Sequence, residues 1–234
     1  MEKAIDELLQ NCKPAVDFML QEITHICRNM KKRAPGSEGE REAAAYMSET
    51  LKSDCGCTDV RIEKFREHPS SFYGYFYFSA ALDTLCAVFF FISPALSLLF
   101  GLAALLLFLC HFVLYKAPID PLFPERESVN VTALRKCSGE VKQRIFLNGH
   151  MDAAWEFPLN YLCGGFVFEI PGLMATCGVL FYMTLSVIFI CSSSMRVYSA
   201  ALCGLIFIPF FILLAFTYNP KRVVDGANDN LSGC

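Results

Sequence analysis

The chain has 234 residues, of which 54% are hydrophobic and 18% are charged, and its net charge is −3. Charged residues make up about a quarter of an ordinary soluble domain. This composition, with a mean hydropathy of +0.40, therefore excludes a simple soluble domain and indicates membrane segments. No cluster of Lys and Arg forms a basic stripe, so we expect no nucleic-acid partner.

Residues 1–72 are predicted to form the first part of a soluble domain, and they begin with a helix. Apolar residues recur at helical spacing over residues 4–29. Pro14 lies inside this stretch and removes a backbone hydrogen-bond donor. We therefore expect either two helices or one helix with a break at this point.

The next two predicted elements are a second helix and a strand. Ser37 followed three residues later by Glu40 is a capping box, which predicts that a helix begins here. Gly56 is expected to end this helix. Residues 58–65 then alternate loosely between apolar and polar side chains, which is typical of a half-buried strand.

A first transmembrane hairpin is predicted over residues 73–116. The chain is almost continuously apolar from Tyr73 to Tyr115, and Ser93-Pro94 divides this block into two halves. Each half has about the twenty residues that a helix needs to cross a bilayer. Asp83 lies inside the first half, where a charge is costly, and we favour a structural role for it over a functional one.

Residues 117–165 return to a soluble composition and carry the first pair of candidate site residues. Strands are predicted over 129–135 and 144–149, and the second ends in His150-Met-Asp152. Side chains two positions apart on an extended chain point the same way. One of the pair can then bind a cation while the other orients it, and an ordinary strand end is the alternative interpretation.

A second transmembrane hairpin is predicted over residues 166–217. Its apolar runs extend from Leu173 to Cys191 and from Val197 to Phe216. Neither hairpin shows the polar face that a helix at the surface of a soluble protein would have. We therefore expect four membrane spans and a lipid bilayer as the partner of both hairpins.

Four spans place all soluble segments on one side of the membrane. The far-side turns carry only Arg196, whereas the soluble segments carry several basic residues close to the spans: Arg61, Lys64, Arg66, Lys116, Lys221 and Arg222. Positive charge favours the cytoplasmic side. The sequence therefore predicts a multi-pass protein of the plasma membrane with its soluble parts in the cytoplasm.

Residues 218–234 carry the second candidate site. Asp225-Gly-Ala-Asn-Asp-Asn-Leu-Ser-Gly233 is rich in turn-forming residues, and a plain turn is one interpretation. Combined with His150, the segment has a second interpretation, as part of a metal site. A carboxylate at Asp229 suits a bridge between two divalent cations, which lie about 3.5–4 Å apart in hydrolytic sites.

These motifs together resemble the di-zinc aminopeptidases of metallopeptidase family twenty-eight, relatives of the bacterial leucyl aminopeptidases and of glutamate carboxypeptidase. The matching segments are Arg33-Ala-Pro-Gly-Ser-Glu-Gly39, Asn130-Val-Thr-Ala-Leu134, Gly149-His-Met-Asp152 and Gly226-Ala-Asn-Asp-Asn-Leu-Ser-Gly233. The resemblance implies that His150 and Asp229 bind metal, with Asp229 bridging two zinc ions. It also implies that Asp152 is a catalytic-site residue that orients His150, and that the Asp229–Asn230 peptide bond is cis.

The resemblance further implies an α/β fold, a three-layer zinc-peptidase domain with a mixed sheet, here incomplete and interrupted by the two hairpins. The implied reaction is hydrolysis of the N-terminal residue from a peptide substrate. The family's general-base Glu, its remaining carboxylate ligands and its last His follow the bridging Asp, and the present chain extends only five residues beyond Asp229. We therefore expect a fragment that is inactive alone.

Strand order gives one geometric expectation. The strands at 58–65, 129–135 and 144–149 follow one another along the chain. If each is antiparallel to the one before it, both hairpins leave the sheet at the edge that carries His150. Sites of open α/β sheets lie at the carboxyl ends of strands. The sequence therefore predicts a catalytic face that is turned toward the bilayer.

Three alternative functions stay open from the sequence. A related di-zinc deacylase or carboxypeptidase would share the His-x-Asp strand end, but its bridging Asp follows a different Gly-rich pattern. A non-catalytic scaffold or receptor could keep the fold without the reaction. A transporter is disfavoured because the spans show no inverted repeat and only one buried acid.

Overall fold

The computed structural model describes residues 2–233 of the chain. It combines helices with small sheets and divides into two compact units. The first, which we call the mixed unit, comprises Met1–Glu67, Glu125–Trp155 and Lys221–Cys234. The second, which we call the helical unit, comprises His68–Pro124 and Glu156–Pro220. The hydropathy pattern of the sequence places the corresponding boundaries at residues 72, 116, 165 and 217.

The mixed unit begins with one continuous helix, α1 (Glu2–Asn29), which contains Pro14. The expected break at Pro14 is therefore wrong. Residues 12–20 are exposed, so no packed neighbour constrains the turns that include and follow Pro14.

Helix α2 (Glu38–Ser53) begins at the predicted capping box. The backbone N–H of Glu40 donates to Ser37 Oγ at 3.2 Å. In return, Glu40 Oε2 accepts from the backbone N–H of Gly36 at 2.9 Å. The cap is confirmed, with Gly36 in place of Ser37 as the second donor. The helix ends at Ser53, ahead of Gly56.

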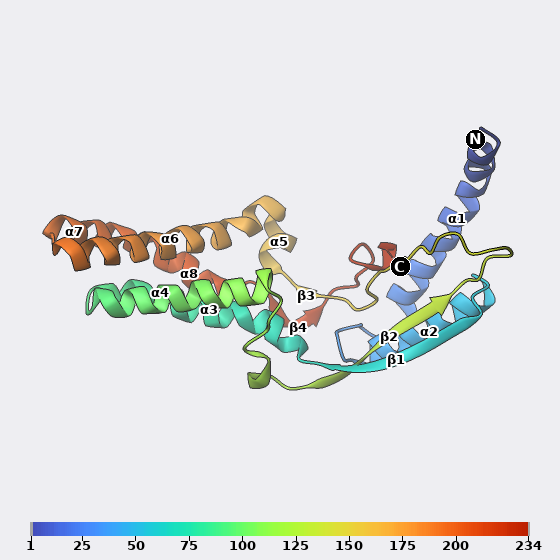
Figure 1. Cartoon of the computed structure of the whole chain (residues 1–234), viewed down its shortest axis with the longest axis horizontal. Coiled ribbons are helices and arrows are strands. Elements are labelled where there is room, and N and C mark those ends of the chain that lie inside the picture. Colours follow the sequence, from blue (N-terminus) through green and yellow to red (C-terminus); the bar gives the residue numbers. More distant parts are fainter. Residues whose placement is uncertain (1, 234) are drawn as a thin grey trace. The chain divides into compact units, whose positions relative to one another are not determined.

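Strands β1 (Asp59–Glu67) and β2 (Arg126–Leu134) form an antiparallel pair in which Asp59 lies opposite Leu134. Both strands were predicted, and the pair is antiparallel, which is the condition that the geometric expectation set for these two strands. Helix α2 packs against this pair, with Ala43 and Ala44 fully buried (Figure 1). The first apolar hairpin lies between the two strands along the chain, so their pairing closes a long loop.

The third predicted strand is wrong, because residues 144–149 adopt no strand conformation. Ile145, Phe146 and Leu147 are 78%, 88% and 93% exposed. A strand needs a neighbour for its backbone groups and a layer that covers one face. Within residues 2–233 no element supplies either one to this segment, and each described sheet has two strands.

The helical unit begins with the first pair of long apolar helices. Helix α3 (Pro69–Phe90) starts four residues before Tyr73, because Pro69 occupies the first turn, where its missing N–H costs nothing. Helix α4 (Pro94–Phe108) follows Ser93 and continues into a π-helical turn, Leu109–Val113. A short 3₁₀ turn at Asp120–Leu122 ends this part of the unit.

The second half of the helical unit contains four further helices. They are α5 (Pro158–Cys163), α6 (Gly165–Ser192), α7 (Met195–Cys203) and α8 (Ile208–Leu214), with a 3₁₀ turn at Gly204–Phe207 between the last two. Helix α6 begins earlier than the apolar run at Leu173, because Gly164 takes a positive φ of 82° and separates it from α5.

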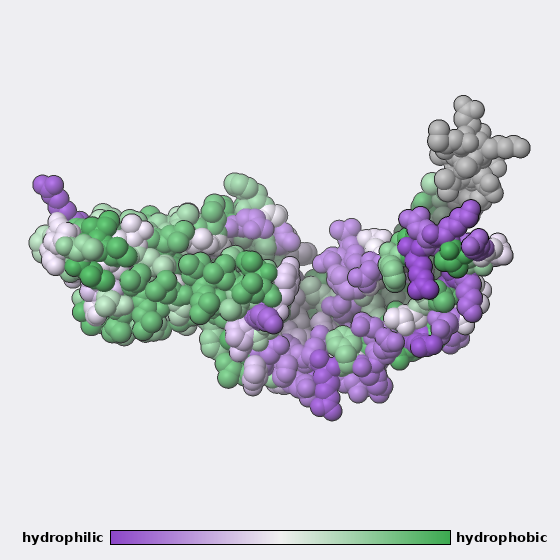
Figure 2. All heavy atoms as spheres, in the orientation of Figure 1, coloured by the Kyte–Doolittle hydropathy of each residue, from purple (hydrophilic) through white to green (hydrophobic). Residues whose placement is uncertain are grey.

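Within the described residues, four helical segments are long and apolar enough to cross a membrane: Pro69–Phe90, Pro94–Val113, Gly165–Ser192 and Met195–Leu214. Figure 2 shows hydrophobic residues over the helices of this unit and hydrophilic residues gathered over the mixed unit. The two predicted hairpins correspond to these four segments.

The bundle has a buried core and a small polar cluster. Cys86, Phe90, Tyr182 and Phe211 are at most 2% exposed. Ser97 Oγ donates to the carbonyl oxygen of Cys86 at 2.7 Å and accepts from Ser186 Oγ at 3.0 Å. Such hydrogen bonds join helices where no water can replace them.

Two short strands lie where the chain passes between the units, β3 before the second apolar hairpin and β4 after it. Strand β3 (Trp155–Glu156) pairs with β4 (Asn219–Val223) in a second two-stranded sheet. The chain then reaches the motif at residues 225–233 and ends in a 3₁₀ turn, Leu231–Gly233.

Candidate functional site

The two predicted motifs lie on loops of the mixed unit that one buried side chain joins. Arg33 is 2% exposed, and its Nε donates to the carbonyl oxygen of Met151 at 2.8 Å. Its Nη2 donates to the carbonyl oxygen of Asp225 at 2.6 Å. The backbone N–H of Ala153 donates to the carbonyl oxygen of Arg33 at 2.7 Å. Arg33 therefore holds the loop after His150 and the loop before Asp229 to one point.

The loops approach closely because small residues face each other. Gly226 has a positive φ of 63°, and a Cβ atom there would lie 2.9 Å from Ala153 Cβ and 2.8 Å from Arg33 Nη2. The backbone N–H of Val224 also donates to the carbonyl oxygen of Ala154 at 3.0 Å. Only glycine fits this position without displacing Arg33.

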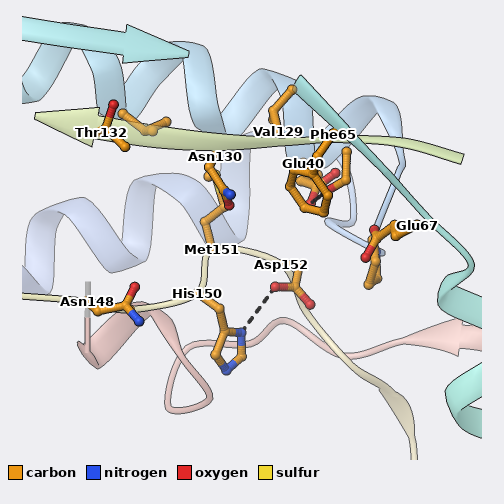
Figure 3. A pocket seen from close by; sticks show the side chains of 14 residues that line it. Glu40, Phe65, Glu67, Val129, Asn130, Thr132, Asn148, His150, Met151 and Asp152 are labelled. Carbon is orange, nitrogen blue, oxygen red and sulfur yellow. Dashed lines mark hydrogen bonds and ion pairs between the residues drawn. The ribbon is translucent and has the colours of Figure 1, made fainter. Parts of the chain in front are cut away.

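This arrangement brings together the three predicted site residues. His150 Nε2 lies 3.1 Å from Asp229 Oδ1, although the two residues are 79 positions apart in sequence. The other ring nitrogen, Nδ1, lies 3.2 Å from Asp152 Oδ1, as Figure 3 shows. The side chains of His150, Asp152 and Asp229 are 50%, 31% and 75% exposed, so solvent and a ligand can reach them.

The Asp229–Asn230 peptide bond is cis, as the family resemblance implied. The turn is closed by backbone hydrogen bonds: Leu231 N–H donates to the carbonyl oxygen of Gly226 at 3.1 Å, and Ser232 N–H donates to that of Ala227 at 3.1 Å. The turn-forming residues thus build an ordered loop that presents Asp229.

A cavity of about 330 Å³ lies beside His150 and Asp152 and contains two further carboxylates, Glu40 and Glu67 (Figure 3). Glu40 is 3% exposed and accepts a hydrogen bond from Ser128 Oγ at 2.6 Å. Burial raises the pKa of Glu40, against the opposing effect of its hydrogen bonds from Ser128 and Gly36. Burial likewise raises the pKa of Glu67, whose Oε1 is buried with no hydrogen-bond partner among the described residues.

Sequence reasoning assigned no site role to Arg33, Glu40 or Glu67. Glu40 had a sufficient local explanation as a helix cap, and Arg33 was noted only as part of a motif. Glu67 lies just beyond the predicted strand end. The surroundings of all three arise from tertiary contacts, and no local spacing signals such contacts.

The donor set fits part of a zinc site. Imidazole nitrogen and carboxylate oxygen both bind zinc at about 2.0–2.2 Å, so two ligands of a tetrahedral ion lie about 3.3 Å apart. The 3.1 Å between His150 Nε2 and Asp229 Oδ1 is close to that separation. Across the residues that the structure describes, no group of three or more His, Cys, Asp or Glu side chains could hold a metal ion. The pair therefore supplies at most part of a coordination shell.

No known protein family, curated protein or solved structure matches this chain.

Proposed function

We propose that the mixed unit contributes His150, Asp229 and Asp152 to the site of a di-zinc aminopeptidase, whose fold is the zinc-peptidase fold and whose helical unit anchors it in a membrane. The observation that carries the proposal is the 3.1 Å approach of His150 Nε2 to Asp229 Oδ1 from two distant loops. Two unrelated loops would have no reason to bring these side chains together.

Each of the three side chains takes a distinct role. His150 would hold a metal ion through Nε2, and Asp229 would contribute a carboxylate ligand to both ions. Asp152 Oδ1 lies 3.2 Å from Nδ1, where it would orient the ring and favour the tautomer in which Nε2 has a free lone pair. Two bound zinc ions would polarise the scissile carbonyl group and lower the pKa of a shared water toward about 7. Asp152 therefore acts by positioning a ligand.

Two ligands do not complete two zinc sites, which take about four donors each. We propose that a C-terminal continuation of the chain in the full-length protein supplies the remaining ligands and a general-base Glu. On this proposal the 234-residue chain alone binds zinc weakly and does not hydrolyse peptides. The full-length protein, in contrast, removes an N-terminal residue from a peptide.

The test compares metal content and leucyl-peptide hydrolysis of the full-length protein in detergent with those of two variants. Asp229→Ala removes the bridging carboxylate, and we expect it to lose both zinc and activity. Asn228→Ala is the matched control, because its exposed side chain lies one residue away in the same loop. We expect this control to keep two zinc ions per chain and near-normal activity.

A failure to bind zinc or to cleave leucyl peptides would support another function. A well-folded full-length protein that binds no metal and cleaves no peptide would overturn the proposal and favour the scaffold or receptor interpretation. Zinc binding with cleavage of acylated or C-terminal substrates instead would favour the deacylase or carboxypeptidase.

A further inference from the structure

A second cavity, of about 320 Å³, lies within the helical unit between α3, α4, α6 and α8. Most of its lining is hydrocarbon or aromatic: Phe76, Leu105, Phe108, Phe112, Val179 and Leu180. Cavities that hold small molecules have volumes of about 300–1,000 Å³. The space is therefore large enough for a small apolar ligand or for part of a larger one.

One acid lies in this apolar lining. Asp83 is 3% exposed and borders the cavity. Ser79 Oγ lies 3.3 Å from Asp83 Oδ2 and 3.5 Å from Tyr75 Oη, so its single proton can serve only one of them. Among the side chains that the structure describes, residues 12–233, no basic group forms an ion pair with Asp83, and the cavity lining contains none.

A carboxyl group in this setting is costly unless it has a partner. A protonated primary amine offers three hydrogen-bond donors and a positive charge. The aromatic rings of Tyr75, Phe108 and Phe112 border the same space, and aromatic faces attract cations. A hydrocarbon body would fill the remaining apolar lining.

We propose that this cavity binds a lipid-like primary amine, with its ammonium group at Asp83 and its hydrocarbon chain among α3, α4 and α6. The site is independent of the proposed peptidase site, because all of its lining residues belong to the helical unit. It gives Asp83 a ligand-binding role in place of the purely structural role that the sequence favoured.

Binding is measured with radiolabelled dodecylamine on the protein in phosphatidylcholine nanodiscs, which contain no primary amine. We expect saturable binding that unlabelled dodecylamine displaces and that dodecanol, which has the same chain length, does not. Asp83→Asn removes the negative charge with little change in shape. We expect it to weaken dodecylamine binding at least tenfold.

A cavity-filling variant tests whether the amine binds in this cavity, without altering Asp83. A Cβ atom at Gly172, which lines the cavity, meets no atom within 4 Å, so Gly172→Leu can fill the space without a clash of its Cβ. Gly165→Leu is the matched control on the same helix, outside the lining, where the nearest atom lies at 3.9 Å. We expect loss of binding in the first variant and normal binding in the second.

Three results would overturn the proposal: undiminished binding to Asp83→Asn, undiminished binding to Gly172→Leu, or equal displacement by dodecanol. If Asp83→Asn fails to fold, the Gly172→Leu and Gly165→Leu pair still decides the question.

Discussion

The guanidinium group of Arg33 donates a hydrogen bond from Nη2 to the backbone oxygen of Asp225 at 2.6 Å. The same side chain reaches the backbone oxygen of Met151 at 2.8 Å, so one buried cation bonds to both loops of the candidate site. The planar guanidinium fork can serve two acceptors in fixed directions. The geometry of His150 and Asp229 therefore depends on the hydrogen bonds from Arg33 to the backbone of both loops.

Replacing Arg33 with Lys should loosen both loops. The single ammonium group of Lys cannot bond to the carbonyl oxygens of Met151 and Asp225 in the geometry of the guanidinium fork. One buried carbonyl oxygen then loses its donor. We expect the free energy of unfolding of the mixed unit to fall by about 2–4 kcal/mol. Hydrogen exchange followed by mass spectrometry should show faster exchange at Ala153 and in residues 225–231.

The control for this variant is Arg41→Lys. Arg41 also donates to backbone oxygens, those of Gly36 at 3.2 Å and Glu127 at 3.5 Å, but these bonds are exposed. We expect a change within about 0.5 kcal/mol. Equal exchange rates in the wild type and Arg33→Lys would show that the loops do not need this side chain.

A methyl group at Gly226 should separate the two loops. Gly226→Ala combines a positive φ with a Cβ position 2.8 Å from Arg33 Nη2 and 2.9 Å from Ala153 Cβ. We expect a loss of about 2–4 kcal/mol in the free energy of unfolding, measured by denaturant titration in detergent.

Gly56→Ala separates backbone strain from steric contact. Gly56 has a similar φ of 66°, but a Cβ atom there meets nothing within 4 Å. We expect this variant to lose only about 1–2 kcal/mol, the cost of the left-handed conformation. If the two variants lose the same amount, the close approach at Gly226 does not contribute.

Elements with complete local signals were predictable from the sequence. The Ser37 and Glu40 spacing located the start of α2, because a cap depends on residues within one turn. The long apolar runs predicted four helices whose length and hydropathy suit a membrane, since these properties need no knowledge of neighbours. The β1 and β2 strands were recognised from alternation.

Features that depend on distant contacts were not predictable. The apolar run at residues 144–149 has the composition of a strand, but a strand forms only where another edge accepts it. The shared cavity of Glu40 and Glu67 arises from packing of α2 against β1 and β2, and the contacts of Arg33 arise from the approach of two loops. Sequence supplied the three residue types at the candidate site, but their distances came from tertiary structure.

The half-buried carboxyl group of Glu67 should make the mixed unit less stable as pH rises. Burial raises its pKa above the ordinary value of 4.5, so the folded chain holds the proton more tightly than the unfolded chain. The stability from this group is fully present below pH 4.5 and is lost as pH rises through the folded pKa. Glu67→Gln should therefore gain stability relative to the wild type between pH 4 and pH 8.

Glu127 is a control, because its pKa shift has the opposite sign to that of Glu67. Lys64 donates a hydrogen bond to its carboxylate and lowers its pKa, so its contribution is present above pH 4.5 and is lost as pH falls. Denaturant unfolding across the pH range should show a small change of opposite direction for Glu127→Gln. A Glu67→Gln difference that stays constant with pH would contradict the burial argument.

We predict the orientation of the chain in the membrane from its basic residues, which favour a cytoplasmic mixed unit. The mixed unit and the turn at residues 193–194 should lie on opposite sides, because a helix pair carries the chain across the membrane and back. Exposed Cys137, in the mixed unit, should react with a membrane-impermeant maleimide only after cells are permeabilised. A cysteine introduced as Ser194→Cys should react in intact cells, giving labelling above that of the wild type. The reverse pattern would place the mixed unit outside the cytoplasm, and the Asn130-Val-Thr and Asn230-Leu-Ser sequences would then be available for glycosylation.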